Sequence, residues 1–450
     1  MPKINDEDKT VDITFFVEPG KRTYVRRINF SGNESTMDEV LRREMVQMEG
    51  GWASTELIEQ SKSRLEQLGF FKGVNVETPK VPGSEDLIDV NYNVEEQPSG
   101  SLNLSIGYSS ADGMIIGSSV SQNNFMGTGK KMSTSVNKTD SQTSLNLSFT
   151  NPYYTVDGIS RGYSIFYSQT DFSEQNLSDY NTDTYGGRST FGFPINSRER
   201  LSFSIEASQT DMTVTTSAPE EIQDFKDVQG DSFVEFTLGS QWSWTTLNRG
   251  LFPTAGAKQS LSLEATLPGS ELEYYRATYN AQKYFPISLN GDWTFRIRTE
   301  VGYGDGYGDT EELPFFRNFR AGGVGSVRGF TSNSLGPKGV YKYSSGLDLD
   351  TDPNTTDDFQ WVEDLNSLGG NLLTEASAEF IFPLPFVEDQ RSMRSAMFID
   401  AGNVYDDEVD LGELRYSAGV SAKWLSPFGA LSFSLATALN DEENDELQAF

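Results

Sequence analysis

The chain has 450 residues, which is more than one compact soluble domain usually holds, so a large barrel or two to three domains is expected. Its 35 basic and 66 acidic residues give a net charge of −31, which argues against nucleic-acid binding because neutralising phosphates requires clustered Lys and Arg. The sequence contains no Cys and no His. Disulfides, thiolate chemistry, a Ser-His-Asp triad and a His-based zinc site are therefore excluded.

The sequence offers no helical route across a membrane. No apolar run approaches the ~20 residues that a transmembrane helix needs. Only helices and closed barrels satisfy every backbone polar group in a bilayer, so a membrane protein with this sequence would have to be a barrel. The first residues contain no apolar signal segment, although a barrel protein must cross the inner membrane. We therefore expect Met1 to begin a shortened form of a longer chain.

Residues 21–98 show a mixed α and β pattern. A strand pattern is followed by two helical patterns and then by two further strands, which predicts the order β-α-α-β-β. Ser35 with Asp38 three residues later fits a helical capping box. Ser54 is placed to begin the second helix, and Gly69 is a typical residue just beyond a helix end. These signals predict one small α+β domain.

From residue 99 to 450 the helical period almost disappears and short alternating segments replace it. In one such segment, Leu145, Leu147 and Phe149 alternate with small polar residues. The segments are long enough to cross a bilayer as tilted strands of about nine to eleven residues. Roughly sixteen segments are found, and bacterial barrels have even strand numbers. The fold class is therefore predicted as mainly β, with a transmembrane barrel after the small domain.

A soluble β-sandwich also has alternating strands and is the alternative. Two features favour the barrel. The polar face carries Ser, Asn, Arg and Glu in nearly every segment, which is typical of a watery lumen. Aromatic residues gather near strand ends, as at Tyr153-Tyr154 and Tyr284-Phe285, which is typical of the belts at membrane interfaces.

One connection, at about 304–370, is far too long for a turn between strands. Structureless connections beyond roughly fifteen residues are usually functional or disordered. Its Gly-rich part, 319–330, contains Arg328 and has the backbone freedom to enter a confined lumen, where the guanidinium would need a carboxylate partner. The alternative is an exposed Arg in a mobile loop. The acidic part, 347–365, is either a solvated external loop or a cation-binding segment at the lipopolysaccharide surface, and it lacks EF-hand spacing.

The loop also carries a family signature. Val327-Arg328-Gly329-Phe330 resembles the sixth-loop motif of the BamA family of outer-membrane protein insertases. The resemblance extends along the chain through Gly32-Asn33, Leu41-Arg42-Arg43-Glu44-Met45, Gln47-Met48-Glu49-Gly50, Leu68-Gly69-Phe70-Phe71, Gly127-Thr128-Gly129, Thr150-Asn151-Pro152-Tyr153, Gly192-Phe193-Pro194-Ile195, Gly302-Tyr303-Gly304-Asp305-Gly306 and Ser426-Pro427-Phe428-Gly429. It implies that 1–20 is the tail of a preceding POTRA domain, 21–98 the last POTRA domain and 99–450 the barrel.

The resemblance also implies partners for the loop arginine. In this family the loop folds back inside the barrel, and its Arg engages acidic residues that correspond to Glu379 and Asp400 here. The alternation supports this independently, because Phe380 and Phe382 would face lipid and Glu379 would then point inward. The role implied for Arg328 is structural and conformational. No bond-making chemistry, cofactor or metal is implied, and the chain is not expected to be an enzyme.

The function implied by the resemblance is the folding and insertion of client outer-membrane proteins through a lateral seam between the first and last strands. An exposed strand edge is a template for another strand. One side of the predicted seam comprises Leu102, Leu104, Ile106, Gly107 and Tyr108. On the other side, Leu447 and Phe450 are interpreted as belonging to the beginning of a truncated last strand, because 447–450 is too short to cross a bilayer.

The resemblance further implies a location and partners. The POTRA domain would face the periplasm of a Gram-negative bacterium, with the barrel in the outer membrane. The expected partners are lipoprotein subunits of the assembly machinery, periplasmic chaperones, unfolded client proteins, outer-membrane lipid and lipopolysaccharide. Glu49 stands where the family contacts its essential lipoprotein partner, and the alternative for Glu49 is a solvated loop acid.

Three other functions compete with insertion. A two-partner secretion transporter shares the barrel and the Arg-Gly motif, but it would export a polypeptide through the lumen. A passive porin would lack the POTRA domain. An outer-membrane hydrolase that depends on His is excluded by composition, and no pair of carboxylates suggests an acid-only active site.

Overall fold

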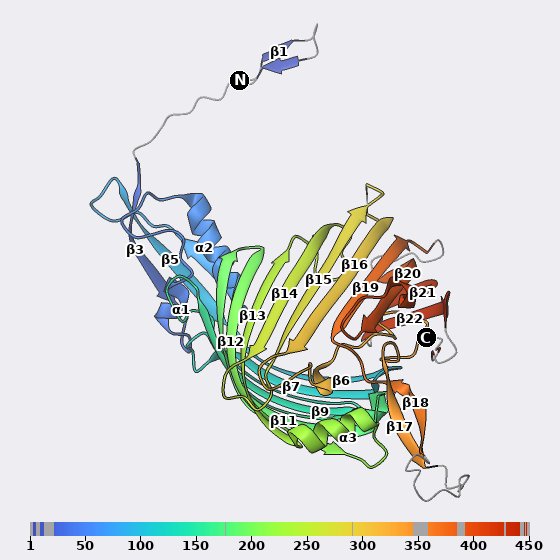
Figure 1. The fold of residues 1–450 in the computed structure, drawn as a ribbon. Coiled ribbons are helices and arrows are strands. Elements are labelled where there is room, and N and C mark those ends of the chain that lie inside the picture. The colour runs from blue at the N-terminus through green and yellow to red at the C-terminus, as the bar shows by residue number, and fades with distance from the viewer. Residues whose placement is uncertain are drawn as a thin grey trace, which may run out of the picture. The chain divides into compact units, whose positions relative to one another are not determined.

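The computed structural model describes residues 3–5, 10–12, 22–175, 177–289, 291–344, 359–384, 392–426, 429–441, 445 and 447. The chain divides into two compact units. The first comprises residues 1–100 and 122–130, and the second comprises residues 101–121 and 131–450. Each unit is described by itself, and Figure 1 labels their elements.

The first unit contains a three-stranded sheet and two helices. In chain order these are β3 (Tyr24–Ser31), α1 (Asp38–Arg42), α2 (Thr55–Gln67), β4 (Phe71–Glu77) and β5 (Leu87–Glu96). β5 lies in the middle of the sheet, parallel to β3 and antiparallel to β4. A separate short hairpin pairs β1 (Lys3–Asn5) with β2 (Thr10–Asp12). The predicted order β-α-α-β-β is confirmed.

The core of this unit follows from the periodicity of its elements. Val25 on β3, Val90 and Tyr92 on β5, and Leu41 and Leu65 on the two helices are completely buried. The strand residues share one face by alternation, and that face packs against the apolar stripe of each helix.

The two helices begin in different ways. Ser54 is the N-cap of α2, and its side chain accepts a hydrogen bond from the Leu57 amide at 3.4 Å, as predicted. The predicted capping box of Ser35 and Asp38 is wrong, because α1 begins after Met37 without a side-chain cap. The Ser35 and Thr36 amides instead donate to the carboxylate of Glu96, at 3.0 and 2.7 Å.

Glu96 therefore holds the chain just before α1 and does not cap the helix itself. Partial burial alone would raise its pKa, but the hydrogen bonds from Thr36 and Ser35 outweigh that effect and hold the pKa of Glu96 below its ordinary value. The carboxylate is consequently charged at neutral pH. It accepts hydrogen bonds from two amides that precede α1, although Glu96 lies on the middle strand of the sheet, far away in sequence.

The second unit is built on an antiparallel sheet of fifteen strands. They are β6 (Gly100–Ser109), β7 (Gly113–Phe125), β8 (Lys130–Lys138), β9 (Gln142–Asn151), β10 (Ser160–Asp171), β11 (Tyr180–Asn196), β12 (Glu199–Val214), β13 (Ser232–Thr245), β14 (Gly256–Thr266), β15 (Tyr274–Pro286), β16 (Thr294–Gly306), β19 (Leu372–Phe382), β20 (Met393–Tyr405), β21 (Arg415–Ser426) and β22 (Gly429–Ala438).

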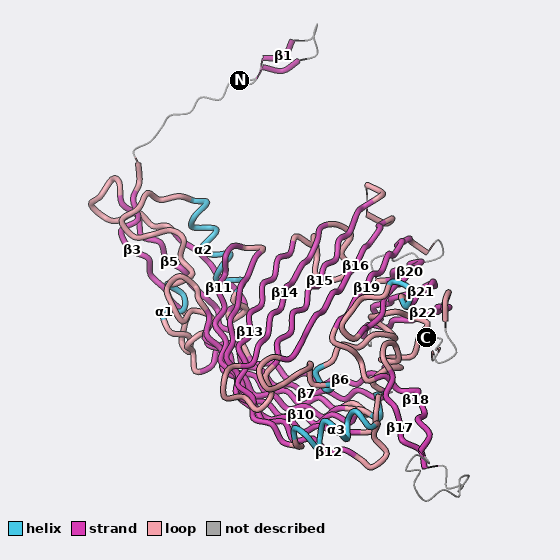
Figure 2. Tube along the Cα trace, in the orientation of Figure 1, coloured by secondary structure: helices cyan, strands magenta, loops and turns pink. Residues whose placement is uncertain are grey.

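The strands of this sheet follow one another in chain order, and β6 and β22 stand at its two ends (Figure 1). In the described residues the sheet curves around but is not closed. The fold class predicted from the sequence is confirmed, with fifteen described strands where about sixteen were expected. Figure 2 shows that strand predominates in this unit and that α3 (Glu220–Gln229) is a short helix beside it. Among the described residues, no helix is both long and apolar enough to span a bilayer.

Burial along the strands follows the alternation that the sequence predicted. On β20, Met397 and Ile399 are exposed, whereas the intervening Phe398 and the following Asp400 are buried. The apolar outward positions suit a lipid environment, and the inward positions carry the polar groups. The same rule places the inward residues of neighbouring strands side by side, because β19 and β20 pair in an antiparallel register.

In the described part of the second unit, two strands lie outside the large sheet. The long connection between β16 and β19 contains the short helix Phe315–Arg317 and a hairpin of β17 (Lys338–Ser344) and β18 (Phe359–Ser367). The first part of the connection is tied to its end, since Phe319 and Gly370 exchange backbone hydrogen bonds of 2.8 and 3.0 Å. Most of the acidic segment 347–365 lies outside the described residues.

Replacing the Ser54 cap tests the local energetics of the first unit. We expect Ser54→Ala to destabilise the start of α2 by about 1 kcal/mol, because one amide of the first turn loses its partner. Hydrogen exchange measured by mass spectrometry on the full chain should then be about fivefold faster in Thr55–Gln67. The matched control is Ser63→Ala, an exposed site on the same helix. Equal exchange in both variants would contradict the cap.

Candidate functional site

The Gly-rich part of the long connection forms a tight turn. The Gly323 amide donates to the Val327 carbonyl at 3.1 Å, and the Ser326 amide donates to Gly323 at 3.2 Å. Gly329 adopts a φ of +99°, a conformation that side chains rarely allow, and a Cβ added there would lie 3.3 Å from the Cβ of Ala436. A glycine is therefore needed for the turn to lie against β22.

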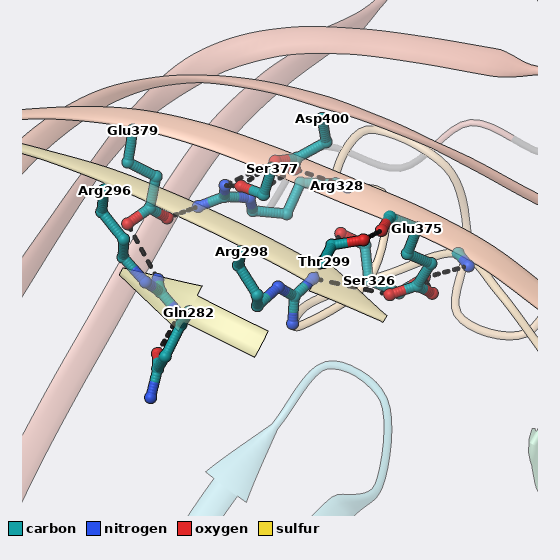
Figure 3. A network of polar contacts seen from close by, with 11 residues as sticks. Gln282, Arg296, Arg298, Thr299, Ser326, Arg328, Glu375, Ser377, Glu379 and Asp400 are labelled. Atoms are coloured by element: carbon teal, nitrogen blue, oxygen red, sulfur yellow. Dashed lines mark hydrogen bonds and ion pairs between the residues drawn. The ribbon is translucent and has the colours of Figure 1, made fainter. Parts of the chain in front are cut away.

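The guanidinium of Arg328 is buried among strand residues (Figure 3). Its Nε lies 2.7 Å from Oδ2 of Asp400 and its Nη2 lies 2.8 Å from Oδ1, which makes a bidentate pair. Its Nη1 lies 3.1 Å from Oε1 of Glu379. The remaining contact of the guanidinium is a hydrogen bond of 3.3 Å to the hydroxyl of Ser377. Both acids are thus brought onto the same guanidinium.

Other groups fix the orientation of these acids. Ser377 donates to Asp400 at 2.7 Å, and Arg296 donates to Oε2 of Glu379 at 2.9 Å. The carbon of the Arg328 guanidinium lies 3.3 Å from the ring centre of Phe398. Each of the two acids is therefore paired with a guanidinium where water is largely excluded. A buried ion pair is tolerated only when its geometry and its remaining hydrogen bonds are this complete.

The apolar residues of the motif have a separate role. Val327 and Phe330 are completely buried. They lie in a cluster from the loop and from β19 and β20 whose other buried members are Phe319, Ala321, Leu335, Leu373 and Val404. Charge and apolar packing therefore hold adjacent residues of one four-residue motif, so that the loop is fixed in both position and orientation.

The sequence reasoning missed a second polar contact of the same loop. The Ser326 hydroxyl donates to the carboxylate of Glu375, and the Ser326 carbonyl accepts from Nη2 of Arg298 at 3.3 Å. Arg298 and Glu375 also form an ion pair at 3.5 Å (Figure 3). Strand alternation was the available signal, because Glu375 has the same parity as Glu379 and therefore faces the loop.

Comparison with known proteins gives a consistent picture. A model of the Omp85 superfamily domain matches residues 124–450, and a POTRA model, described as a surface antigen variable number repeat, matches residues 23–97. The crystal structure of BamA from Haemophilus ducreyi lacking POTRA domains 1–3 is 34% identical, covers the whole chain and 87% of that structure, and superposes with a TM-score of 0.88. The chain belongs to the BamA family of the Omp85 superfamily.

Other relatives agree with this membership. The outer membrane protein assembly factor BamA of Neisseria meningitidis serogroup B is 36% identical over the whole chain, which spans 58% of that relative. The corresponding protein of Neorickettsia risticii is 26% identical over 98% of this chain, and the match covers 56% of that relative. The chain therefore spans a little over half the length of these relatives. CdiB from Escherichia coli shares the fold at a TM-score of 0.56, with 14% identity and coverage of 95% of this chain and 75% of that one.

Membership of the BamA family places the chain in the bacterial outer membrane and directs attention to the two end strands of the sheet. On β6, Leu102, Leu104, Ile106 and Tyr108 are all more than 60% exposed. Gly107 of the same strand has room for a side chain, since the nearest atom would lie 3.9 Å from an added Cβ.

Residues at the end of the chain are placed differently. Leu447 forms an isolated antiparallel bridge with Phe330 of the motif. Phe450 lies outside the described residues. β22 is therefore the strand that ends the described sheet, and the roles of β6, Leu447 and Phe450 in a lateral seam remain predictions.

Glu49, in the first unit, is partly engaged. Its carboxylate accepts from the Ile28 amide at 2.8 Å and lies 3.5 Å from Nη1 of Arg42, while its side chain is 46% exposed. The carboxylate of Glu49 therefore accepts a hydrogen bond from a backbone amide of β3 while part of its side chain remains accessible to solvent. Contact of Glu49 with a lipoprotein partner remains a prediction of the family resemblance.

The arrangement has the features of a mechanical anchor. Within the described ranges, no three acidic side chains are grouped in a way that would hold a metal ion. Each acid around Arg328 is committed to a guanidinium or a hydroxyl. On this geometry, the site holds the loop against β19 and β20.

Replacing Arg328 tests the anchor. Arg328→Lys keeps the charge but loses the planar fork that pairs both oxygens of Asp400, so we expect a loss of about 3–5 kcal/mol of loop attachment. In purified protein in detergent micelles, limited proteolysis should cut within 319–330 much faster than in the original chain. The control is Arg188→Lys, a lumen arginine paired with Glu206 of the neighbouring strand. Unchanged protection in Arg328→Lys would show that the bidentate pair is dispensable.

Replacing the second contact should have a smaller effect. Glu375→Gln removes the ion pair with Arg298 but keeps the shape of the side chain, so we expect a loss of about 1–3 kcal/mol. The same proteolysis assay gives the measurement, and a double-mutant cycle with Arg328→Lys gives the coupling. Thr299→Val is the control, because that hydroxyl bonds the carbonyl of Glu375 and not the loop. A larger effect than that of Arg328→Lys would reverse the assigned order of the two contacts.

Proposed function

We propose that this chain is the central barrel subunit of an outer-membrane β-barrel assembly machinery, and that it folds and inserts client outer-membrane proteins through a seam between β6 and its last strand. The observation that carries the proposal is the first strand of the sheet. In the described residues, β6 is ten residues long and pairs with one neighbour only. A free strand edge of that length offers donors and acceptors to an incoming strand.

The surface of β6 suits an incoming membrane strand. Its outward residues are apolar, and its inward residues are polar, as in the hydrogen bond of 2.8 Å between the Ser101 and Ser121 hydroxyls across to β7. A client strand added at this edge in register would continue the apolar outer face. The lipid chains would then contact the same kind of surface that they contact on the remaining strands.

The anchored loop supports β22, the strand at the other end of the described sheet. Gly329 lies against Ala436 and Ala438 of β22. It directly follows Arg328, whose guanidinium is paired with acids on β20 and β19. A displacement of the motif would therefore remove a support from the inner face of β22. This gives the loop a conformational role in the proposed insertion without any bond-making step.

The POTRA domain is proposed to face the periplasm and to receive partners. On its β3 edge, the chain itself occupies the backbone groups, because Gly50 donates to Val25 at 2.7 Å and Ala53 donates to Thr23 at 2.9 Å. The β4 edge is the other end of this sheet and is the proposed site of strand addition. Lipoprotein subunits, at a surface that includes Glu49, and chaperones with their unfolded clients are the proposed partners, with lipid and lipopolysaccharide around the barrel.

The alternative is a polypeptide transporter of the two-partner secretion type. The similarity to CdiB concerns the fold alone, at 14% identity. The BamA relatives share far more sequence over the same chain. Export through the lumen would also require displacement of the loop from Asp400 and Glu379, which breaks a buried ion pair.

Client folding in liposomes tests the proposal. The chain, extended to the length of its relatives, is reconstituted with the partner lipoproteins and an unfolded client barrel, and folding is followed as a heat-modifiable gel band. We expect faster client folding than in empty liposomes. The seam is tested by single cysteines, since the chain has none of its own. A cysteine at Ser105 on β6 should crosslink to a cysteine in a terminal strand of the client.

Thr190→Cys is the matched control for the crosslink. Thr190 lies on β11, which pairs with neighbours on both sides, and should give no adduct. Equal adducts at both positions would remove the seam from the mechanism. An absence of accelerated folding would reject insertion and favour secretion or passive transport.

A further inference from the structure

The loop carries two further arginines, and both point to strands other than those that hold Arg328. Arg317, in the short helix Phe315–Arg317, donates from Nη2 to Oε2 of Glu235 at 2.5 Å. Glu235 lies on β13 and is completely buried. In sheet order, β14, β15 and β16 separate β13 from β19, so this contact is made to a distant part of the wall.

The surroundings of this ion pair are aromatic. Phe316 stacks on Phe233 with ring centres 5.9 Å apart, and the Arg317 guanidinium lies 5.8 Å from the ring of Tyr274. A wider cluster of buried apolar side chains from β11, β13, α3 and the loop encloses the site. Apolar residues of similar size would fill such a site at no loss of stability, so a buried ion pair here serves position more than stability.

Arg320 adds a second contact in the same direction. Its Nη2 donates to the hydroxyl of Tyr180 on β11 at 3.0 Å, and its guanidinium lies 4.7 Å from the ring of Phe172. Tyr180 is itself almost completely buried. The loop is therefore attached to β11 and β13 before it reaches the turn that carries Arg328.

We propose that Arg317 with Glu235, supported by Arg320 with Tyr180, forms a second anchor, and that segment 317–328 is a strut between two walls of the sheet. One end is fixed on β11 and β13, and the other on β19 and β20. Arg317, Glu235 and Arg320 are positioning residues, because they act on the motif through the backbone of the segment. Their effect on client insertion rests on the function proposed above, whereas the strut itself is a property of this chain alone.

The strut constrains the curvature of the sheet. The hydrogen-bonded ladder from β13 to β20 runs around the wall, while the segment connects the same two regions directly. A change in curvature alters the distance between the two walls and is resisted by both ion pairs. Since curvature determines how far apart β6 and β22 lie, the second anchor would bias the width of the seam.

Pulsed EPR distances test the strut. Spin labels at Val324 on the loop and Val234 on the outer face of β13 report the second anchor, and labels at Val324 and Ile399 on β20 report the first; all three positions are exposed, and the chain has no cysteine. We expect Arg317→Met and Glu235→Gln to add a longer-distance population to the Val324–Val234 pair only. Arg317→Lys, which keeps the charge, should restore much of the short distance.

The control is the double variant Arg188→Met with Glu206→Gln, a lumen ion pair between β11 and β12 that does not involve the loop. An unchanged Val324–Val234 distance in Arg317→Met and Glu235→Gln would overturn the strut, as would an equal change in the control. Heat-modifiable migration confirms that each variant is folded, and Glu235→Gln is the milder variant should Arg317→Met fail this check. Client folding is measured separately, so a strut that is present without insertion would reject only the proposed function.

Discussion

The arrangement of the strands in the second unit depends on the burial of one guanidinium. Arg328 loses its water only because Asp400 and Glu379 approach it from neighbouring strands, with distances of 2.7 to 3.1 Å. Those acids in turn need Ser377 and Arg296. The strands β16, β19 and β20 must pair in this register, because a slip by one residue would turn every one of these side chains to the lipid face.

Sheet and loop therefore specify each other. The alternation of the strands provides inward acids, and the bidentate partner of Asp400 comes from the loop. The loop also supplies the apolar side chains of Val327 and Phe330 that fill the space beside it. The same loop reaches the opposite part of the wall at Glu235. A polar interior, which is unfavourable for packing, is in this way given a defined structure by the pairing of these charges.

Local patterns were sufficient for much of this structure. Periodicity predicted the order of the POTRA elements and the inward and outward faces of the strands, and Ser54 predicted the start of α2. The assignment of Glu379 and Asp400 to Arg328 required the family resemblance, since spacing along the chain does not say which strands adjoin. Glu375 was within reach of the alternation rule and was missed.

Contacts between distant segments account for the rest. Glu96, which accepts hydrogen bonds from the amides just before α1, lies 61 residues from Ser35, so a search for local capping boxes could not find it. Glu235 and Arg317 are 82 residues apart and belong to elements of different kinds. Nothing in the periodicity of either segment distinguishes these charges from solvated ones. Only the curvature of the sheet, which depends on all its strands, brings them together.

The placement of the loop also bears on permeability. Barrels of about sixteen strands leave an aqueous channel unless something occupies it. Here the interior holds a turn whose apolar residues are completely buried and whose charges are neutralised. The loop therefore narrows the passage that a barrel of this width would otherwise leave open, and it places paired charges and packed apolar side chains there.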